Sequence, residues 1–173
     1  SNYKSLPVQQ IKDLMMNAGV WPLIQKRPFS IVAEPGDKPK AIFISCFDSS
    51  PLAPDYNFIL SNEKEFFQAG LDVMNMFTKG KLHLNVNGDS IEKDFFNQFS
   101  GCQVNEFYGP HPAGNVGIQI HHVNPINKGD VVWTLSPQSL VTIGRFFEKG
   151  IYDVSKIVAL TGSEVKIQQY YRV

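Results

Sequence analysis

Two short apolar runs without polar alternation constrain most strongly what this chain can fold into. They are residues 41–47 (AIFISCF) and residues 130–135 (DVVWTL). Strands that read as continuous apolar runs are typical of parallel sheets whose two faces are both covered by helices. We therefore expect an α/β domain built around a central sheet, with further strands at residues 82–86, 104–108 and 156–161.

Amphipathic helices are predicted between these strands. Apolar residues recur at helical spacing after Ser5, after Asn62 and after Ser136, and each pattern stops at a glycine. Asn62 with Glu65 three residues later reads as a capping box, and Ser136 followed by Pro137 is a helix start. A short helix is expected at residues 90–101 and another at 113–122. This alternation predicts a Rossmann-like α/β fold, a mostly parallel twisted sheet with helices on both faces.

Composition limits the organisation and the partners. The chain has 173 residues, of which 43% are hydrophobic, and its 16 basic residues balance 16 acidic ones. We expect a single α/β domain over residues 1–173, cut from a longer protein, with Ser1 and Asn2 as the remnant of a tag. A balanced charge argues against nucleic acid and against direct binding to an anionic membrane. No apolar run approaches the roughly 18 residues that span a bilayer.

The loop at residues 109–116 (GPHPAGNV), called the proline loop below, joins a predicted strand to a predicted helix. In α/β folds this junction binds anions and cofactors, because backbone N–H groups converge at the helix start. Its glycines are spaced as in a phosphate loop, but Asn115 and Val116 stand where that loop needs lysine and a hydroxyl. A nucleoside triphosphatase is therefore excluded, and the absence of G-x-G-x-x-G argues against nicotinamide bound in this chain.

Four residues are candidates for ligand binding. Arg27 and Phe29 lie together in a long irregular loop at residues 20–40. There the guanidinium can donate hydrogen bonds to a planar carbonyl ligand, and the ring can stack on it. His111, between two prolines, and Gly114 lie in the proline loop, where the imidazole can bind a carbonyl or an anion. The alternatives are a histidine that bonds only its own turn and an arginine exposed beside a packed ring. No histidine pair has metal-binding spacing, and no catalytic nucleophile pattern occurs, so neither a metal site nor a catalytic residue is expected.

A series of blocks resembles the A subunit of the bacterial Na⁺-translocating NADH:quinone reductase. The blocks occur in the family's order along nearly the whole chain, with GPHPAG the most telling of them. They are residues 27–30 (RPFS), 41–43 (AIF) with Asp48 and 51–53 (PLA), 69–73 (AGLDV), 109–114 (GPHPAG) and 158–162 (VALTG). The resemblance implies the middle domain of that protein.

That middle domain is similar in fold to the flavin- and NADH-binding subunit of complex I and to the C subunit of the Rnf complex. Those relatives carry a glycine-rich loop after the first helix, where this chain keeps only Gly19. Flavin phosphate needs close backbone approach, which Trp21, Leu23 and Ile24 are expected to obstruct. We therefore expect that this domain kept the fold and binds no flavin, with NADH, FAD, FMN and iron–sulfur centres in the other subunits.

The resemblance implies a non-flavin peripheral subunit that contributes to quinone reduction and to the assembly of the complex. Quinone is then the substrate of the complex, the other subunits are the partners, and the enzymatic activity belongs to the assembly rather than to the isolated domain. The expected location is the cytoplasmic face of the bacterial inner membrane, with membrane contact only through partners. Two alternatives stay open: an FMN- or nucleotide-binding oxidoreductase domain that uses the helix start after Gly114, and a ligand-free interaction scaffold.

Overall fold

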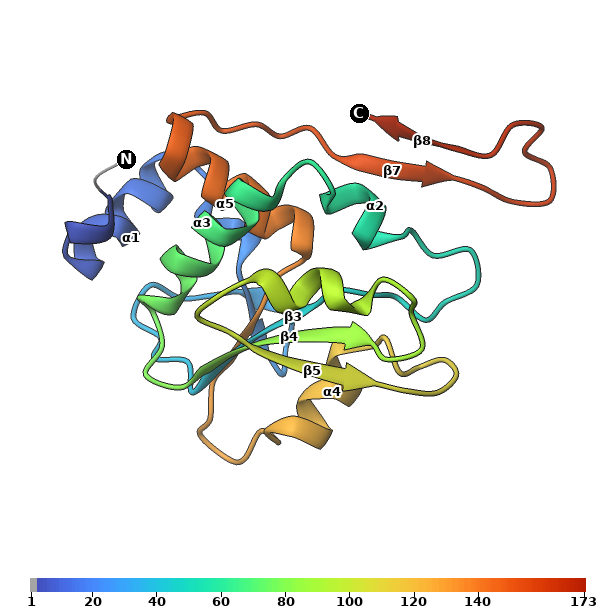
Figure 1. Cartoon of the computed structure of the whole chain (residues 1–173). Helices are drawn as coiled ribbons and strands as arrows, with labels where there is room; N and C mark the ends of the chain where they lie inside the picture. The colour runs from blue at the N-terminus through green and yellow to red at the C-terminus, as the bar shows by residue number, and fades with distance from the viewer. Residues whose placement is uncertain (1–2) are drawn as a thin grey trace.

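The structure is a computed structural model that describes residues 3–173, so the expected tag residues Ser1 and Asn2 lie outside the described part (Figure 1). Its strands are β1 (Gln25–Arg27), β2 (Ile31–Val32), β3 (Ala41–Ser45), β4 (Lys81–Asn87), β5 (Gln103–Phe107), β6 (Val132–Thr134), β7 (Ile157–Leu160) and β8 (Gln169–Arg172). Its α-helices are α1 (Val8–Asn17), α2 (Tyr56–Leu60), α3 (Lys64–Asn75), α4 (Val116–Val123) and α5 (Pro137–Lys149). Short 3-10 turns occur at Tyr3–Ser5, Trp21–Leu23 and Lys93–Gln98.

The central sheet has six strands in the order β2-β1-β6-β3-β4-β5. Neighbouring strands from β6 to β5 all pair in parallel, which confirms the predicted mostly parallel sheet. Strands β1 and β2 form an antiparallel hairpin, and β1 also pairs antiparallel with β6. The hairpin lies within residues 20–40, where an irregular loop is predicted, because strands of two or three residues are too short to show a period of two.

Helices cover both faces of the sheet, as predicted (Figure 1). Alternate residues of β3 are buried on opposite faces, since side chains alternate along a strand. Ile42 and Ile44 belong to the larger core, which α1, α3 and α5 share, whereas Ala41 and Phe43 pack with Ile120 of α4. A strand buried on both faces needs apolar side chains at every position, which explains the unbroken apolar run.

Two helix ends follow the sequence closely. The hydroxyl of Ser136 accepts a hydrogen bond from the Ser139 N–H at the start of α5, and Gly150 ends that helix in the left-handed conformation.

Helix α4 begins at Val116 rather than at residue 113, because the side chain of Asn115 accepts the Gly117 N–H and caps the helix there. The proline loop is therefore longer than expected.

Three other predicted helix features are wrong in detail. Helix α3 begins after Glu63 without a side-chain cap, so the capping box at Asn62 does not form. Helix α1 begins after Pro7, and Ser5 lies in the preceding 3-10 turn instead of capping it. The helix expected at residues 90–101 is a 3-10 turn, and α2 has no counterpart among the predicted helices. Side-chain packing decides these ends, since local start signals are weak there.

The last predicted strand lies outside the main sheet. It forms β7, which pairs antiparallel with β8 in a separate two-stranded hairpin that extends from the body of the molecule (Figure 1). The side-chain amide of Gln138 in α5 holds this hairpin through two hydrogen bonds to the backbone of Ile157, of 2.9 and 2.8 Å. The hydroxyl of Tyr170 also accepts the Asp55 N–H. Within residues 3–173, no helix is long and apolar enough to cross a membrane.

Candidate functional site

A cleft of about 600 Å³ opens where the sheet changes its direction of winding. Strand β3 is followed in sequence by β4 on one side, whereas β6 lies on its other side. The loops after β3 and β6 therefore diverge, and such a switch point is where α/β sheets bind ligands. The residues that line the cleft come from β1, from the ends of β3 and β6, from the proline loop and from the starts of α4 and α5.

Three of the four predicted ligand residues line this cleft. Arg27, His111 and Gly114, which lie up to 87 positions apart in the sequence, are brought together by the pairing of β1 with β6 and by the proline loop. Phe29 does not line the cleft, and its side chain is 75% exposed. The Arg27–Pro28 and His111–Pro112 peptide bonds are both cis.

Gly114 allows two loops to touch. A Cβ atom on this residue would lie 2.4 Å from the backbone nitrogen of Ser49, which is closer than real Cβ contacts permit. The Gly114 N–H donates to the Ser49 hydroxyl at 2.8 Å, and the same hydroxyl lies 3.1 Å from Nδ1 of His111. The glycine is therefore required for close approach of the proline loop to the loop after β3, and His111 is held by that loop.

Arg27 lies beside the start of α4. A Cβ atom on Gly117 would lie 3.0 Å from Nη2 of Arg27, so the guanidinium reaches the first turn of the helix. Nη1 of Arg27 donates to the Ser30 hydroxyl at 2.5 Å. The arginine therefore stays close to the positive end of the α4 dipole.

A chain of side-chain amides, half-buried at Asn105 and fully buried at Asn85 and Gln119, supports the proline loop. Asn105 donates to Asn85 at 2.8 Å, and Asn85 donates to Gln119 at 2.9 Å. Gln119 in turn donates to the Ser45 hydroxyl and to the Ala113 carbonyl oxygen, at 2.9 and 3.1 Å. These supporting residues are absent from the predicted site. The signal in the sequence is the polar residue Asn85 between the apolar residues Leu84 and Val86 of β4.

The carboxylate in the cleft has hydrogen-bond partners, whereas the two cationic side chains there form no ion pair with the described residues. The N–H and hydroxyl of Ser50 donate to Asp48 and hold the pKa of that carboxyl below its usual value, so it stays ionised. Arg27 and Lys156 line the same cleft and form no ion pair within residues 3–173. The cleft can therefore attract a polar or anionic group. In this described part, no cluster of three His, Cys, Asp or Glu side chains could hold a metal.

Trp21 and Ile24, which are expected to obstruct close approach of a flavin, do not line the cleft. Trp21 is buried in the larger core, where its indole N–H donates to the Ala33 carbonyl oxygen at 2.7 Å and its ring packs edge-on against Trp133. Ile24 is also fully buried. Only Leu23 of this segment lines the cleft, because the 3-10 turn at Trp21–Leu23 directs the two larger apolar side chains into the core.

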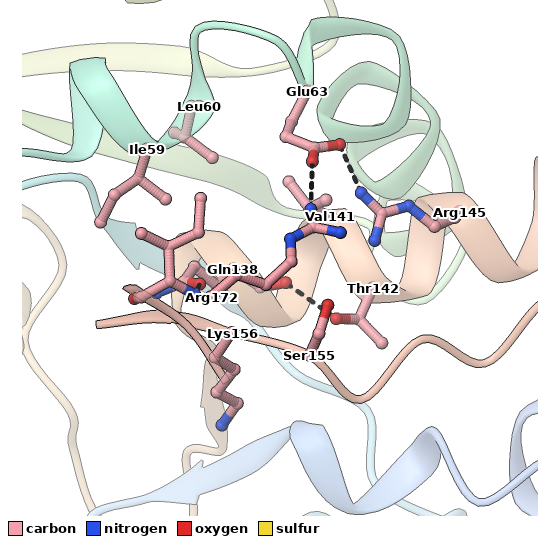
Figure 2. A pocket seen from close by; sticks show the side chains of 11 residues that line it. Ile59, Leu60, Glu63, Gln138, Val141, Thr142, Arg145, Ser155, Lys156 and Arg172 are labelled. Atoms are coloured by element: carbon pink, nitrogen blue, oxygen red, sulfur yellow. Dashed lines mark hydrogen bonds and ion pairs between the residues drawn. The ribbon is translucent and has the colours of Figure 1, made fainter. Parts of the chain in front are cut away.

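A second cavity, of about 20 Å³, lies between α2, α5 and the β7–β8 hairpin (Figure 2). Arg145 donates to Glu63 at 2.5 Å and also pairs with Asp153, while Arg172 lies 3.5 Å from Glu63. This cavity has room for about one water molecule. Lys156 borders both cavities, and Figure 2 shows its side chain pointing away from Glu63 and Arg145.

The fold and the cleft together define a class: a doubly wound α/β domain with an open crevice at the point where its strand order reverses. The chain belongs to the family of the NqrA second alpha/beta domain, whose model matches residues 6–152. This match confirms the resemblance on which the sequence-based expectations depend.

Named relatives agree with that family. The chain is 38% identical over 158 residues to the A subunit of the Na(+)-translocating NADH-quinone reductase of Yersinia pseudotuberculosis, a match that covers 91% of this chain and 35% of the relative. It is 33% identical over 168 residues to the protein of the same name from Photorhabdus laumondii, which covers 96% of this chain and 37% of the relative. The chain therefore spans about a third of the length of these relatives.

Proposed function

We propose that this chain acts as the middle domain of the A subunit in a Na⁺-translocating NADH:quinone reductase, without a flavin of its own. The observation that carries this proposal is the match to the family model over residues 6–152, together with 33–38% identity to proteins of that name. The activity belongs to the assembled complex. In this proposal NADH, FAD, FMN and iron–sulfur centres are held by other subunits.

The cleft at the strand switch point is the proposed ligand site. Arg27 and His111 line it, and both carry N–H groups that suit the carbonyl oxygens of a quinone head group. Its volume of about 600 Å³ suits a small organic ligand. Gly114 contributes by bringing the proline loop close to the loop after β3.

The proposed partners are the other subunits of the complex, at the cytoplasmic face of the bacterial membrane. A formal net charge of zero suits docking to protein better than docking to anionic lipid. Phe29 is 75% exposed and lies outside the cleft, so we assign it to a contact with a partner protein rather than to the ligand.

Calorimetric titration of the chain with a water-soluble short-chain quinone tests the site. We expect saturable binding that weakens at least about fivefold in Arg27→Gln and in His111→Ala. The first substitution replaces the charged guanidinium donor by a shorter neutral amide, and the second removes the imidazole donor. Lys128→Gln, which removes an exposed charge outside the cleft, is the matched control. Equal binding in all variants would remove the site assignment, and no binding at all would favour an interaction scaffold.

Thermal unfolding with and without FMN tests the flavin-binding alternative. A ligand that binds the folded state raises the melting temperature by mass action. We expect no rise with FMN or with NADH. A yellow protein, or a melting temperature that increases with FMN concentration, would contradict the assignment of the flavin to other subunits.

A further inference from the structure

We propose that the cleft contains an oxyanion subsite, formed by the start of α4, the guanidinium of Arg27 and the hydroxyl of Thr134. The subsite binds the phosphate or carboxylate group of a ligand. This inference rests on the proposed function in placing a ligand in the same cleft, and it adds an oxyanion group that a quinone head group does not carry. Two side chains and the strand pairing that brings them together are the three features that carry it.

The first feature is the position of Arg27. Its guanidinium reaches the first turn of α4, where a Cβ atom on Gly117 would lie 3.0 Å from Nη2. A helix start is electropositive and favours anions, so an anion would stabilise a cation beside it. The acceptor present there is the uncharged side-chain oxygen of Asn115, which caps the Gly117 N–H. The only polar partner of Arg27 within residues 3–173 is the uncharged hydroxyl of Ser30, at 2.5 Å. An anion in the cleft would neutralise both positive groups.

The second feature is the side chain of Thr134. Only 6% of its surface is exposed, and it lines the cleft, yet its hydroxyl has no hydrogen-bond partner in the described part of the chain. Its oxygen keeps solvent access from the cleft, since the fully buried side-chain atoms without a partner in residues 3–173 belong to Tyr3, Asn57, Trp133 and Thr161. The hydroxyl is therefore a donor at the wall of the cleft that no group in the described part of the protein occupies. A hydroxyl donates to an oxyanion without competing for its charge.

The third feature is that the pairing of β1 with β6 brings these two side chains to one face of the sheet. Arg27 pairs with Val132, and Thr134 lies two positions further along the same strand. Side chains two positions apart on a strand share a face, and diagonal neighbours in an antiparallel pair have Cα atoms about 7–8 Å apart. A phosphate or carboxylate can bridge such a gap. Val132 also packs with Ile120 of α4, so this face is the one that α4 covers.

The remaining groups in the cleft are consistent with an anionic ligand that extends away from this subsite. The start of α5, capped by Ser136, lines the same cleft, and so does the ammonium-bearing Lys156. The single carboxylate among the described lining residues, Asp48, is already satisfied by two hydrogen bonds from Ser50. The cleft thus offers more positive than negative charge to a ligand.

Titration of the ¹⁵N-labelled chain with inorganic phosphate, and separately with acetate, at constant ionic strength tests the subsite. We expect saturable shifts at the amides of Val116, Gly117 and Ile118. Arg27→Gln should weaken binding at least about tenfold, since a charge-assisted hydrogen bond is lost. Lys128→Gln is the charge-matched control and should leave the affinity nearly unchanged. Preference for phosphate or for acetate identifies which oxyanion the subsite accepts.

Thr134→Val provides a second, nearly isosteric test. Because the hydroxyl has no partner in the described part of the protein, this substitution should not lower the melting temperature without an anion, but it should reduce the increase that phosphate produces. Absence of saturable shifts at the start of α4 with both anions, or equal affinity in Arg27→Gln and Lys128→Gln, would overturn the subsite. Quinone binding without oxyanion binding overturns only the subsite, whereas oxyanion binding without quinone binding overturns only the proposed quinone site.

Discussion

The side-chain amides of Asn85 in β4 and Gln119 in α4 are hydrogen-bonded to each other at 2.9 Å in the interior, where neither residue has any exposed surface. This bond adds a polar contact to the apolar packing of Ile120 that holds the helix on the sheet. Gln119 also holds the Ala113 carbonyl oxygen and the Ser45 hydroxyl, so it joins the proline loop to the end of β3. The geometry of the cleft therefore depends on a residue that does not line it.

Gln119→Leu should lower the free energy of unfolding by about 2 kcal/mol, because it leaves the buried amide of Asn85 without its acceptor. Urea unfolding at neutral pH measures this change. Gln10→Leu, at an exposed position of α1, is the control and should change the stability by less than about 0.5 kcal/mol. Equal stability of the two variants would contradict the structural role of Gln119.

Gly144→Ala should destabilise the protein by at least about 2 kcal/mol, because it overpacks the contact between α3 and α5. A Cβ atom there would lie 1.8 Å from the Phe66 carbonyl oxygen and 2.7 Å from the backbone nitrogen of Gly70. Gly36→Ala is the matched control, since nothing lies within 4 Å of its Cβ position. Guanidinium unfolding of both variants checks the difference, and a Gly144→Ala protein as stable as the control would contradict it.

The stability should fall as the pH decreases from 6.5 to 5, and His83 should be the cause. Burial, with a smaller effect of Lys81, lowers the pKa of His83 from 6.5 to about 4, and its ring stacks on Phe43 at 4.5 Å. Below pH 6.5 the unfolded chain binds a proton that the folded chain does not, so stability present above 6.5 is lost on the way to pH 4, on the order of 3 kcal/mol in total.

Urea unfolding at several pH values between 7 and 5 measures this loss. His83→Gln should flatten the dependence in that window, because glutamine does not titrate. A His83→Gln protein that loses as much stability as the parent chain between pH 6.5 and 5 would show that another group is responsible.

Arg145→Met should lower the free energy of unfolding by about 3 kcal/mol, because it leaves the largely buried carboxylate of Glu63 without its closest partner. Only 13% of the Arg145 side chain and 14% of the Glu63 side chain are exposed. Arg172→Met is the control, since Arg172 contacts the same carboxylate but its side chain is 58% exposed, so it should cost less than about 1 kcal/mol. Similar losses in the two variants, measured by urea unfolding, would contradict this difference.

The regular parts of the fold can be predicted because their signals are local. The apolar run of β3, the alternation of strands and helices, and the cap and glycine of α5 all follow from neighbouring residues, and the structure confirms them. The β1–β2 hairpin and α2 escape prediction, since they are short and depend on contacts with distant segments. The burial of Trp21 in the core escapes prediction for the same reason, since it depends on packing against the distant Trp133.

The fold class and the family can be read from the chain alone, because hydrophobic patterning, turn residues and ordered blocks are properties of residues taken in order. The same reading indicates Arg27, His111 and Gly114 as residues to examine. Three-dimensional packing adds that these three share one open cleft, that Phe29 lies outside it, and that Thr134 faces it without a partner in the described part of the chain. The physical reason is that burial, pairing and charge compensation are relationships between residues far apart in sequence, which exist only once the sheet has formed.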